Sequence, residues 1–340
     1  RTRTFNLMRA SEREALYAPM RRALADARSV LSIGHPDGDG DSIGSQLALH
    51  AFCTHLGKRS VPLNFDSISP SISWLPGIGD MVDRLPPAET FDLILLMETT
   101  DVSRMGDRVS FFERAKLKIH LDHHLNVRGL GDLNLLDHEA SSTCELLFEL
   151  LSGMGTALTQ ATREALYVGI MTDTVNFRFP NSTPRAHEIA AHLIAHGLDT
   201  PRLYKLVYEA NTCQRILIQG TAMSRVTSRR NGTLFYTWLT REDFSRLGAT
   251  DIDADGAVNH TCTITGGEVG LLFRELDNGR IKVSLRSTGR FDVCAVSRHF
   301  GGGGHKLAAG IQVDGPLQSA IDLVLKDVEA CMEISDDATS

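Results

Sequence analysis

The chain lacks several features that mark particular classes of protein. Its six cysteines form no CxxC pair, which argues against a zinc ribbon or a disulfide framework and favours a reduced intracellular chain. It has no apolar run of about 18 residues and no signal-peptide pattern. We therefore predict a protein of the cytoplasm that has no membrane partner.

The chain also lacks an excess of positive charge. Its formal net charge is −7 at pH 7, whereas proteins that grip long nucleic acids through their phosphates usually carry a basic field. A small phosphorylated ligand, which needs few local cations, remains compatible with this charge. The hydrophobic content of 42% is ordinary for a globular protein, and a length of 340 residues favours two domains.

The pattern of apolar residues predicts an α/β fold. Short apolar runs alternate with helical patterns in the first half, which is typical of a parallel sheet with flanking helices. We expect strands at 29–34, 59–65, 91–98 and 116–122. Helical patterns dominate from about 141 to 228, and strands with turns follow, with a last amphipathic helix near 316–331. We predict a catalytic domain at 1–195, a helical linker at 196–230 and a smaller α/β domain with a mixed sheet at 231–335.

Acidic and histidine side chains follow the predicted strands. The stretch "GHPDGDGDSIGS" follows the first strand, Glu98 ends the third, and "DHH" (122–124) ends the fourth. Asp173 adds a carboxylate within an apolar helical run. An aspartate after a strand is most often a helix N-cap, but the carboxyl ends of parallel strands meet at one edge of a sheet. Four such stretches together therefore predict a ligand site there.

The ligand types favour divalent metal ions. Asp37, Asp39 and Asp41 match the first positions of a calcium loop, but Ser42 and Ala48 stand where that loop needs glycine and glutamate. A mixed set of imidazoles and carboxylates suits ions such as Mn²⁺ better than calcium. This set has more ligands than one ion needs and enough for two ions. A pair of ions can clamp both the attacking and the leaving oxygen in phosphoryl transfer.

Five stretches resemble the DHH phosphoesterase family. They are "HPDGDGDSIGS", "LILLMETTDVSRMG", "IHLDHH", "GIMTDTVNFRF" and "GGGGHKLAAG", the last of which resembles the signature of the DHH-associated C-terminal domain. They occur in the order of the family and span most of the chain. The length and two-domain layout of the chain are similar to those of the family branch that contains nanoRNases, pAp phosphatases and cyclic-dinucleotide phosphodiesterases.

The resemblance implies a set of metal ligands. His35 and Asp39 would hold one Mn²⁺, and Asp41, His123 and Asp173 the other. Glu98 would bridge the two ions, although the family more often has aspartate there. Asp37 is left as a spare carboxylate, and Asp101 could compensate for the longer glutamate.

The resemblance also implies catalytic and substrate-binding residues. Asp122 would orient an imidazole, and His124 would contact the scissile phosphate or protonate the leaving group. Together with Asp41, these form the expected catalytic set. Glycines and cations would bind the substrate's phosphate. The expected substrate-binding residues are Arg286, Ser287, Gly302, Gly303, Gly304, His305, Arg104 and Arg178.

The resemblance implies a homodimeric, Mn²⁺-dependent phosphodiesterase and exoribonuclease. Water activated by two ions would release 5′-mononucleotides from nanoRNA or from linear dinucleotides such as pApA and pGpG, and the enzyme would also act on pAp. Mg²⁺ is an alternative metal. Alternative functions are a cyclic-dinucleotide phosphodiesterase, a family II-like inorganic pyrophosphatase, or a catalytically weak nucleotide-binding regulator.

Overall fold

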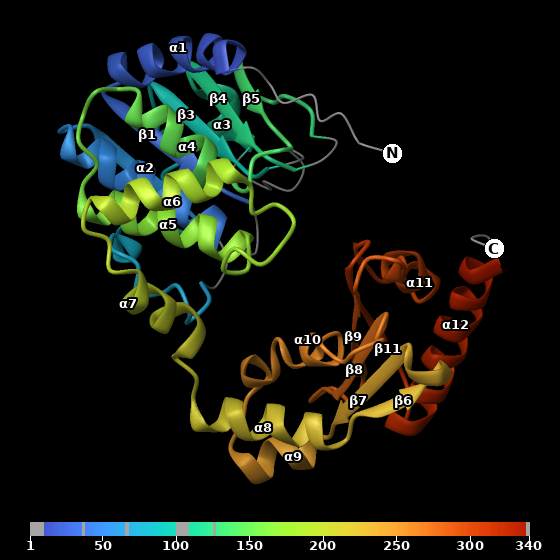
Figure 1. Cartoon of the computed structure of the whole chain (residues 1–340). Coiled ribbons are helices and arrows are strands. Elements are labelled where there is room, and N and C mark those ends of the chain that lie inside the picture. The colour runs from blue at the N-terminus through green and yellow to red at the C-terminus, as the bar shows by residue number, and fades with distance from the viewer. Residues whose placement is uncertain (1–9, 36–37, 65–67, 100–108, 125–126, 338–340) are drawn as a thin grey trace. The chain divides into compact units, whose positions relative to one another are not determined.

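The computed structural model describes residues 10–35, 38–64, 68–99, 109–124 and 127–337. The chain divides into two compact units, Arg1–Ala210 and Asn211–Ser340. Figure 1 shows helices on a sheet in each unit. No helix within the described residues is long and apolar enough to cross a membrane.

Unit 1 contains a parallel sheet in the order β2-β1-β3-β4-β5. The middle strand, with the sequence LILLM, is buried along its whole length, as is typical of central parallel strands covered on both faces. The strands are β1 (Ser29–Ile33), β2 (Arg59–Leu63), β3 (Leu93–Met97), β4 (Leu117–Asp122) and β5 (Leu133–Leu136).

Helices cover both faces of this sheet. One face and its helical layer share a core that includes Leu95, Phe52 and Leu166, and the smaller core on the other face includes Leu96 and Phe112. The larger layer contains α1 (Ala10–Asp26), α2 (Gly40–His55), α4 (Thr143–Ser152), α5 (Gln160–Asp173) and α6 (Pro184–Ala195), and α3 (Val109–Arg114) lies on the other side. A short α7 (Thr200–Tyr204) and a π-helical turn (Lys205–Glu209) end the unit.

Unit 2 contains a mixed sheet in the order β10-β11-β9-β8-β7-β6. The pair β7–β8 is parallel, and the other pairs are antiparallel. The strands are β6 (Thr227–Arg229), β7 (Leu234–Leu239), β8 (Val269–Glu275), β9 (Ile281–Ser287), β10 (Gly303–His305) and β11 (Ala308–Val313).

The helices of unit 2 bury apolar residues against this sheet in two clusters. Val324 and Val293 belong to the cluster that contains Leu285, and Ile218 and Phe244 belong to the cluster that contains Leu272. The helices are α8 (Cys213–Ser224), α9 (Arg241–Leu247), α10 (Ala257–Thr261), α11 (Val293–His299) and α12 (Leu317–Asp337).

The predicted α/β class is confirmed, with a parallel sheet in unit 1 and a mixed sheet in unit 2. The four strands expected in the first half begin and end within two residues of their observed bounds. Within the glycine-rich stretch, Gly303–His305 pairs with Ala308–Gly310 as a short hairpin. Sequence patterns left out β5, which is short and only partly buried.

Candidate active site

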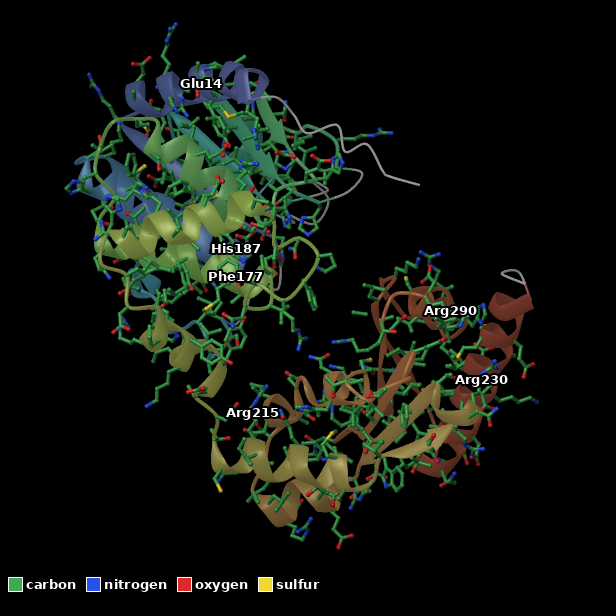
Figure 2. All side chains as sticks on the ribbon, in the orientation of Figure 1. Glu14, Phe177, His187, Arg215, Arg230 and Arg290 are labelled. Carbon is green, nitrogen blue, oxygen red and sulfur yellow. The ribbon has the colours of Figure 1, made fainter. Side chains whose placement is uncertain are left out.

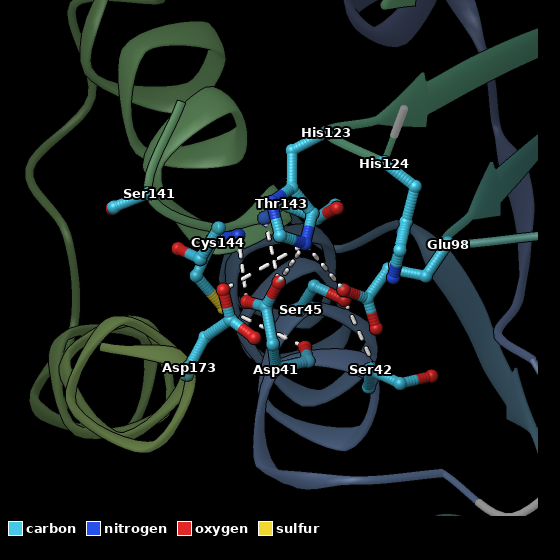
Figure 3. Close-up of polar contacts among 12 residues, drawn as sticks. Asp41, Ser42, Ser45, Glu98, His123, His124, Ser141, Thr143, Cys144 and Asp173 are labelled. Atoms are coloured by element: carbon cyan, nitrogen blue, oxygen red, sulfur yellow. Dashed lines mark hydrogen bonds and ion pairs between the residues drawn. The ribbon is translucent and has the colours of Figure 1, made fainter. Parts of the chain in front are cut away.

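Acidic and histidine side chains gather where the strands of unit 1 end. Residues after β1 and β3, at the end of β4 and at the end of α5 contribute to this group. Figure 3 shows the part of the site that surrounds Asp41. The residues are His35, Asp39, Asp41, Glu98, Asp122, His123, His124 and Asp173. Asp37 and Asp101 lie outside the described residues.

Asp39 both caps α2 and belongs to this group. Its Oδ1 atom accepts hydrogen bonds from the backbone N–H groups of Asp41 at 3.0 Å and Ser42 at 3.1 Å, which is the ordinary role of an aspartate at a helix start. The Nε2 atom of His35 lies 3.9 Å from the same oxygen and 3.7 Å from Oε2 of Glu98. The capping role therefore leaves Asp39 within reach of the site.

Asp41 is held at the N-terminus of α4. Its carboxylate oxygens accept backbone N–H bonds from Thr143 at 2.6 Å and Cys144 at 2.9 Å (Figure 3). The positive end of a helix stabilises a negative charge in this position. Gly169 on α5 allows this close packing, because a Cβ atom there would lie 2.2 Å from Cys144 Sγ and 2.8 Å from Asp41 Oδ1.

Glu98 lies between two groups of side chains. It directly follows β3, its exposed fraction is 2%, and its φ of 57° is uncommon for a residue other than glycine. Oε2 lies 3.7 Å from His35 Nε2, and Oε1 lies 3.4 Å from His123 Nε2. Burial raises the pKa of Glu98 well above its ordinary value, and the charges of Asp41 and Asp39 raise it further.

His123 directs one ring nitrogen at three carboxylates. Nε2 lies 3.4 Å from Glu98, 3.8 Å from Asp173 and 3.9 Å from Asp41. This Nε2 atom has no hydrogen-bond partner among the described residues. The backbone of Ala140 interacts with the imidazole of His123. Burial lowers the pKa of His123, which favours the neutral form that can bind a metal ion.

Asp122 orients His124. Oδ1 of Asp122 accepts hydrogen bonds from the backbone N–H of His124 at 2.8 Å and from its Nδ1 atom at 2.9 Å. The bond to Asp122 raises the pKa of His124. Burial would raise the pKa of Asp122, but His120 and His124 outweigh burial and hold that pKa below its usual range. His124 is therefore a partly exposed imidazole with a fixed orientation and a raised basicity.

Asp173 ends α5 beside a turn with unusual backbone angles. Asn181 Nδ2 donates to the Oδ2 atom and to the carbonyl oxygen of Asp173, both at 3.2 Å. Val175, Asn176 and Phe177 all have positive φ, a strain that tends to occur at functional sites. Phe177 packs on His187 with the ring centroids 5.0 Å apart (Figure 2). Burial and the charge of Asp41 raise the pKa of Asp173 to about 8.

The donor set fits divalent metal ions. Ligand atoms of His35, Asp39 and Glu98 lie within 4.8 Å of one another, and so do those of Glu98, His123 and His124. Glu98 Oε2 and His123 Nε2 are buried without a hydrogen-bond partner in the described part of the chain. Four carboxylates of the site form no ion pair with a lysine or arginine among the described residues. They are Asp39, Asp41, Glu98 and Asp173. Cations bound here would satisfy both the charge and the orphaned atoms.

In unit 2, Arg286 lies on β9 beside the glycine-rich hairpin. Its register partner on β11 is Ala308, whose own partner on β10 is His305. The Nε atom of Arg286 donates to Asn259 Oδ1 at 3.1 Å, and burial lowers its pKa. Ser287 is buried, and its hydroxyl oxygen accepts from the backbone N–H of Gly289.

The glycines of the hairpin have different structural requirements. A Cβ atom added at Gly302 would lie 2.3 Å from the carbonyl oxygen of Gly310. A Cβ atom added at Gly304 would lie 2.4 Å from the carbonyl oxygen of Ala308. At Gly303 a Cβ atom would meet no atom within 4 Å among the described residues. Packing within the unit therefore explains two of these glycines and leaves Gly303 open to a ligand.

Of the two arginines expected near the catalytic motifs, Arg178 lies within the described residues. Arg178 is exposed, and its guanidinium carbon lies 5.8 Å from the centroid of the Phe179 ring. Arg104 lies outside the described residues. Arg178 therefore follows Asp173 along the chain without joining the hydrogen-bond network described above.

A further histidine, aspartate and cysteine group occurs in unit 2. Ligand atoms of His299, Asp327 and Cys331 lie within 4.8 Å of one another. His299 Nδ1 and Asp327 Oδ2 lie 2.9 Å apart. An ordinary exposed ion pair accounts for that contact.

The site also contains residues that sequence patterns did not single out. They are His120, Thr143, Cys144 and Asn181. His120 could have been found from strand alternation, because it precedes Asp122 by two residues and so lies on the same face of β4. The backbone donors carry no sequence signal, since any residue except proline supplies an N–H group.

Comparisons with known proteins agree with this geometry. Residues 29–170 match the model of the DHH family N-terminal domain, and residues 231–334 match the model of the DHHA1 domain. The chain belongs to the DHH phosphoesterase family. It is accordingly a hydrolase that acts on phosphate esters. The family depends on divalent metal ions, and the acidic and histidine groups described above could bind them.

Relatives within the family carry more particular names. The chain is 31% identical to the "Bifunctional oligoribonuclease and PAP phosphatase NrnA" of Thermus thermophilus, over 86% of this chain and 87% of that protein. It is 30% identical to the protein of the same name from Bacillus subtilis, over 88% of this chain and 93% of that protein. A solved structure of an exopolyphosphatase-related protein from Bacteroides fragilis matches with a TM-score of 0.87 and 26% identity, over 95% of this chain and 98% of that one.

Proposed function

We propose that this protein is a Mn²⁺-dependent phosphodiesterase that hydrolyses short oligoribonucleotides and linear dinucleotides such as pApA and pGpG to 5′-mononucleotides, and that it also acts on pAp. Relatives that the chain matches over most of its length are named for oligoribonuclease and PAP phosphatase activities. That the protein is a cytoplasmic homodimer stays a prediction.

The observation that carries the proposal is the position of Glu98 between two groups of ligand-type atoms. One oxygen faces His35 at 3.7 Å and the other faces His123 at 3.4 Å. We assign His35, Asp39 and Glu98 to one ion, and Asp41, Glu98, His123 and Asp173 to the other. When bound, such ions supply Lewis acidity to the phosphate oxygens and lower the pKa of water.

The chain's own residues orient the site and move a proton. Backbone N–H groups of α4 hold Asp41 in place. Asp122 holds His124 through Nδ1, so that the other ring nitrogen can give a proton to the leaving oxygen. The raised pKa of His124 favours the protonated imidazole that such an acid needs.

Unit 2 supplies groups that suit the phosphate of a short substrate. Arg286 presents a guanidinium group, which can bind two phosphate oxygens at once. Gly303 allows a ligand to approach the backbone of β10 closely. We assign Arg286, Ser287, His305 and the glycines of the hairpin to the substrate, and Arg104 and Arg178 to charge neutralisation beside the catalytic motifs.

A turnover panel tests this proposal. The protein, with Mn²⁺ or with Mg²⁺, is incubated with pApA, pAp, cyclic di-AMP and pyrophosphate, and products are separated by length. Release of AMP from pApA supports the proposal, and selective hydrolysis of pyrophosphate or of the cyclic dinucleotide would replace it with one of those activities. Tight binding without products would identify a nucleotide-binding regulator instead.

A further inference from the structure

His120 is a buried histidine with no part in the proposed metal or substrate contacts. It lies on β4 with an exposed fraction of 0%. Side chains alternate between the faces of a strand, so His120 and Asp122 lie on the same face. Buried polar atoms nearly always have hydrogen-bond partners, so the partners of its two ring nitrogens show what the imidazole does.

The protonation of the His120 ring follows from its neighbours. The backbone N–H of Leu130 donates to Nδ1 at 3.3 Å. Nδ1 is therefore the acceptor of a neutral imidazole, and the proton lies on Nε2. Nε2 lies 3.5 Å from Oδ2 of Asp122. Neither of these two atoms has a hydrogen-bond partner among the described residues, and both side chains are buried.

The other oxygen of Asp122 is already engaged. Oδ1 accepts hydrogen bonds from the backbone and from Nδ1 of His124. His120, Asp122 and His124 therefore form a continuous row in which each imidazole faces a different carboxylate oxygen. An approach of about 0.5 Å would bring the His120 N–H group to normal hydrogen-bond length.

We propose that His120 is a positioning residue for the reaction. Its Nε2–H group holds Oδ2 of Asp122, so that Oδ1 stays in the orientation that binds His124 and directs it at the leaving group. Without this donor, a buried carboxylate oxygen faces no N–H group and the carboxylate can turn about its last bond. The inference rests on the proposed function, because His124 has this role only in phosphoester cleavage.

Two substitutions of similar shape separate positioning from packing. His120→Gln keeps an N–H donor at the end of the side chain, and His120→Met fills the same space without one. Each variant is assayed with Mn²⁺ on pApA, whose leaving alkoxide needs a proton, and on thymidine 5′-p-nitrophenyl phosphate, whose leaving phenolate does not. Thermal unfolding of both variants monitors the fold.

We expect the Met variant to lose kcat on pApA by about tenfold or more, with little change in KM and only a small loss on the nitrophenyl ester. The Gln variant should recover most of the lost kcat. Equal losses on the two substrates, or full activity of the Met variant, would overturn the proposal, because either result removes the link between His120 and the leaving group.

A second measurement does not depend on turnover. In protein labelled with ¹⁵N-histidine, nuclear magnetic resonance should find His120 protonated at Nε2, and a hydrogen-bonded Nδ1 proton on His124 in the wild type and the Gln variant but not in the Met variant. Protonation of His120 at Nδ1 would refute the inference even if a variant failed to fold. A wild type that cleaves neither ester would refute the proposed function alone, and the spectra would still decide the role of His120.

Discussion

His123 and Glu98 face each other across the centre of the site, with Nε2 3.4 Å from Oε1. The other oxygen of the same carboxylate lies 3.7 Å from His35. Glu98 is therefore shared between two groups that come from different strand ends. The length and the charge of the Glu98 side chain can therefore be tested by separate substitutions.

Shortening Glu98 should impair the site without unfolding it. In Glu98→Asp, both oxygens retreat by one methylene, so we expect kcat to fall by about tenfold and Mn²⁺ to bind more weakly. Glu98→Gln keeps the length but removes the charge, and should lower kcat by about 100-fold or more. For both variants, kcat is measured by pApA turnover and Mn²⁺ affinity by calorimetry. An Asp variant as active as the wild type would show that the reach of glutamate is not needed.

Neutralising Asp173 should stabilise the chelated protein. Its pKa of about 8 in the fold exceeds the value of about 3.9 in an unfolded chain. The folded state therefore holds a proton that the unfolded state releases, and this carboxyl makes the stability fall as pH rises from about 4 to 8.

We expect Asp173→Asn to raise the melting temperature in EDTA at pH 8 on the order of 5 °C, and to reduce the slope of melting temperature against pH in that window. The same variant should lose turnover. Asp83→Asn, at a side chain that is 67% exposed, serves as the control and should change neither quantity. A decrease in melting temperature for Asp173→Asn would contradict the repulsion described here.

The backbone donors to Asp41 can be removed one at a time. Thr143 is the first residue of α4, where proline fits a helix, and Ser142 before it is extended, as a residue before proline prefers. Thr143→Pro should therefore keep the helix but delete the N–H group that lies 2.6 Å from Asp41. We expect Mn²⁺ affinity to fall by about 10- to 100-fold, measured by calorimetry.

The matched control is Thr143→Ala, which keeps the N–H group and removes the hydroxyl and methyl groups. It should bind Mn²⁺ like the wild type. If the alanine and proline variants lose equal affinity, the side chain rather than the backbone donor supports Asp41.

The hairpin of unit 2 allows a test of ligand approach. Gly303→Ala adds a methyl group that contacts no atom within 4 Å among the described residues. We expect the melting temperature to be unchanged and KM for pApA to rise by about tenfold, because the methyl group would occupy the space of the substrate. Gly302→Ala, whose Cβ would lie 2.3 Å from a carbonyl oxygen, should instead lower the melting temperature. An unchanged KM in Gly303→Ala would remove this segment from the substrate contacts.

The sequence predicted the fold class because its central strands are continuous apolar runs that end in polar motifs, as "LILLM" does before Glu98. It also placed eight side chains at one end of the sheet of unit 1, and the structure brings them together. Their roles as metal ligands and catalytic groups stay predictions. Sequence patterns could not show that Glu98 has a positive φ, because backbone conformation at a strand end depends on tertiary contacts.

The missed features have related physical causes. The support of Asp41 comes from N–H groups, which every residue but proline possesses, so Thr143 and Cys144 carry no recognisable signal. Asn181 interacts with Asp173 through a turn whose left-handed residues include valine, a residue that disfavours such a conformation. The pairing of β11 with β9 depends on a strand that ends more than 20 residues earlier in the chain, which local patterns in the glycine stretch do not show.

The bonds that join Asp41 to Thr143 and Cys144 span 102 and 103 positions of the chain. During synthesis on the ribosome, the aspartate emerges long before the helix that supports it. A nascent chain that stops before α4 carries most of the ligand-type side chains, yet it lacks the donors that orient Asp41. Full orientation of Asp41 therefore requires α4, so a chain truncated before Thr143 should bind Mn²⁺ more weakly than the full-length chain.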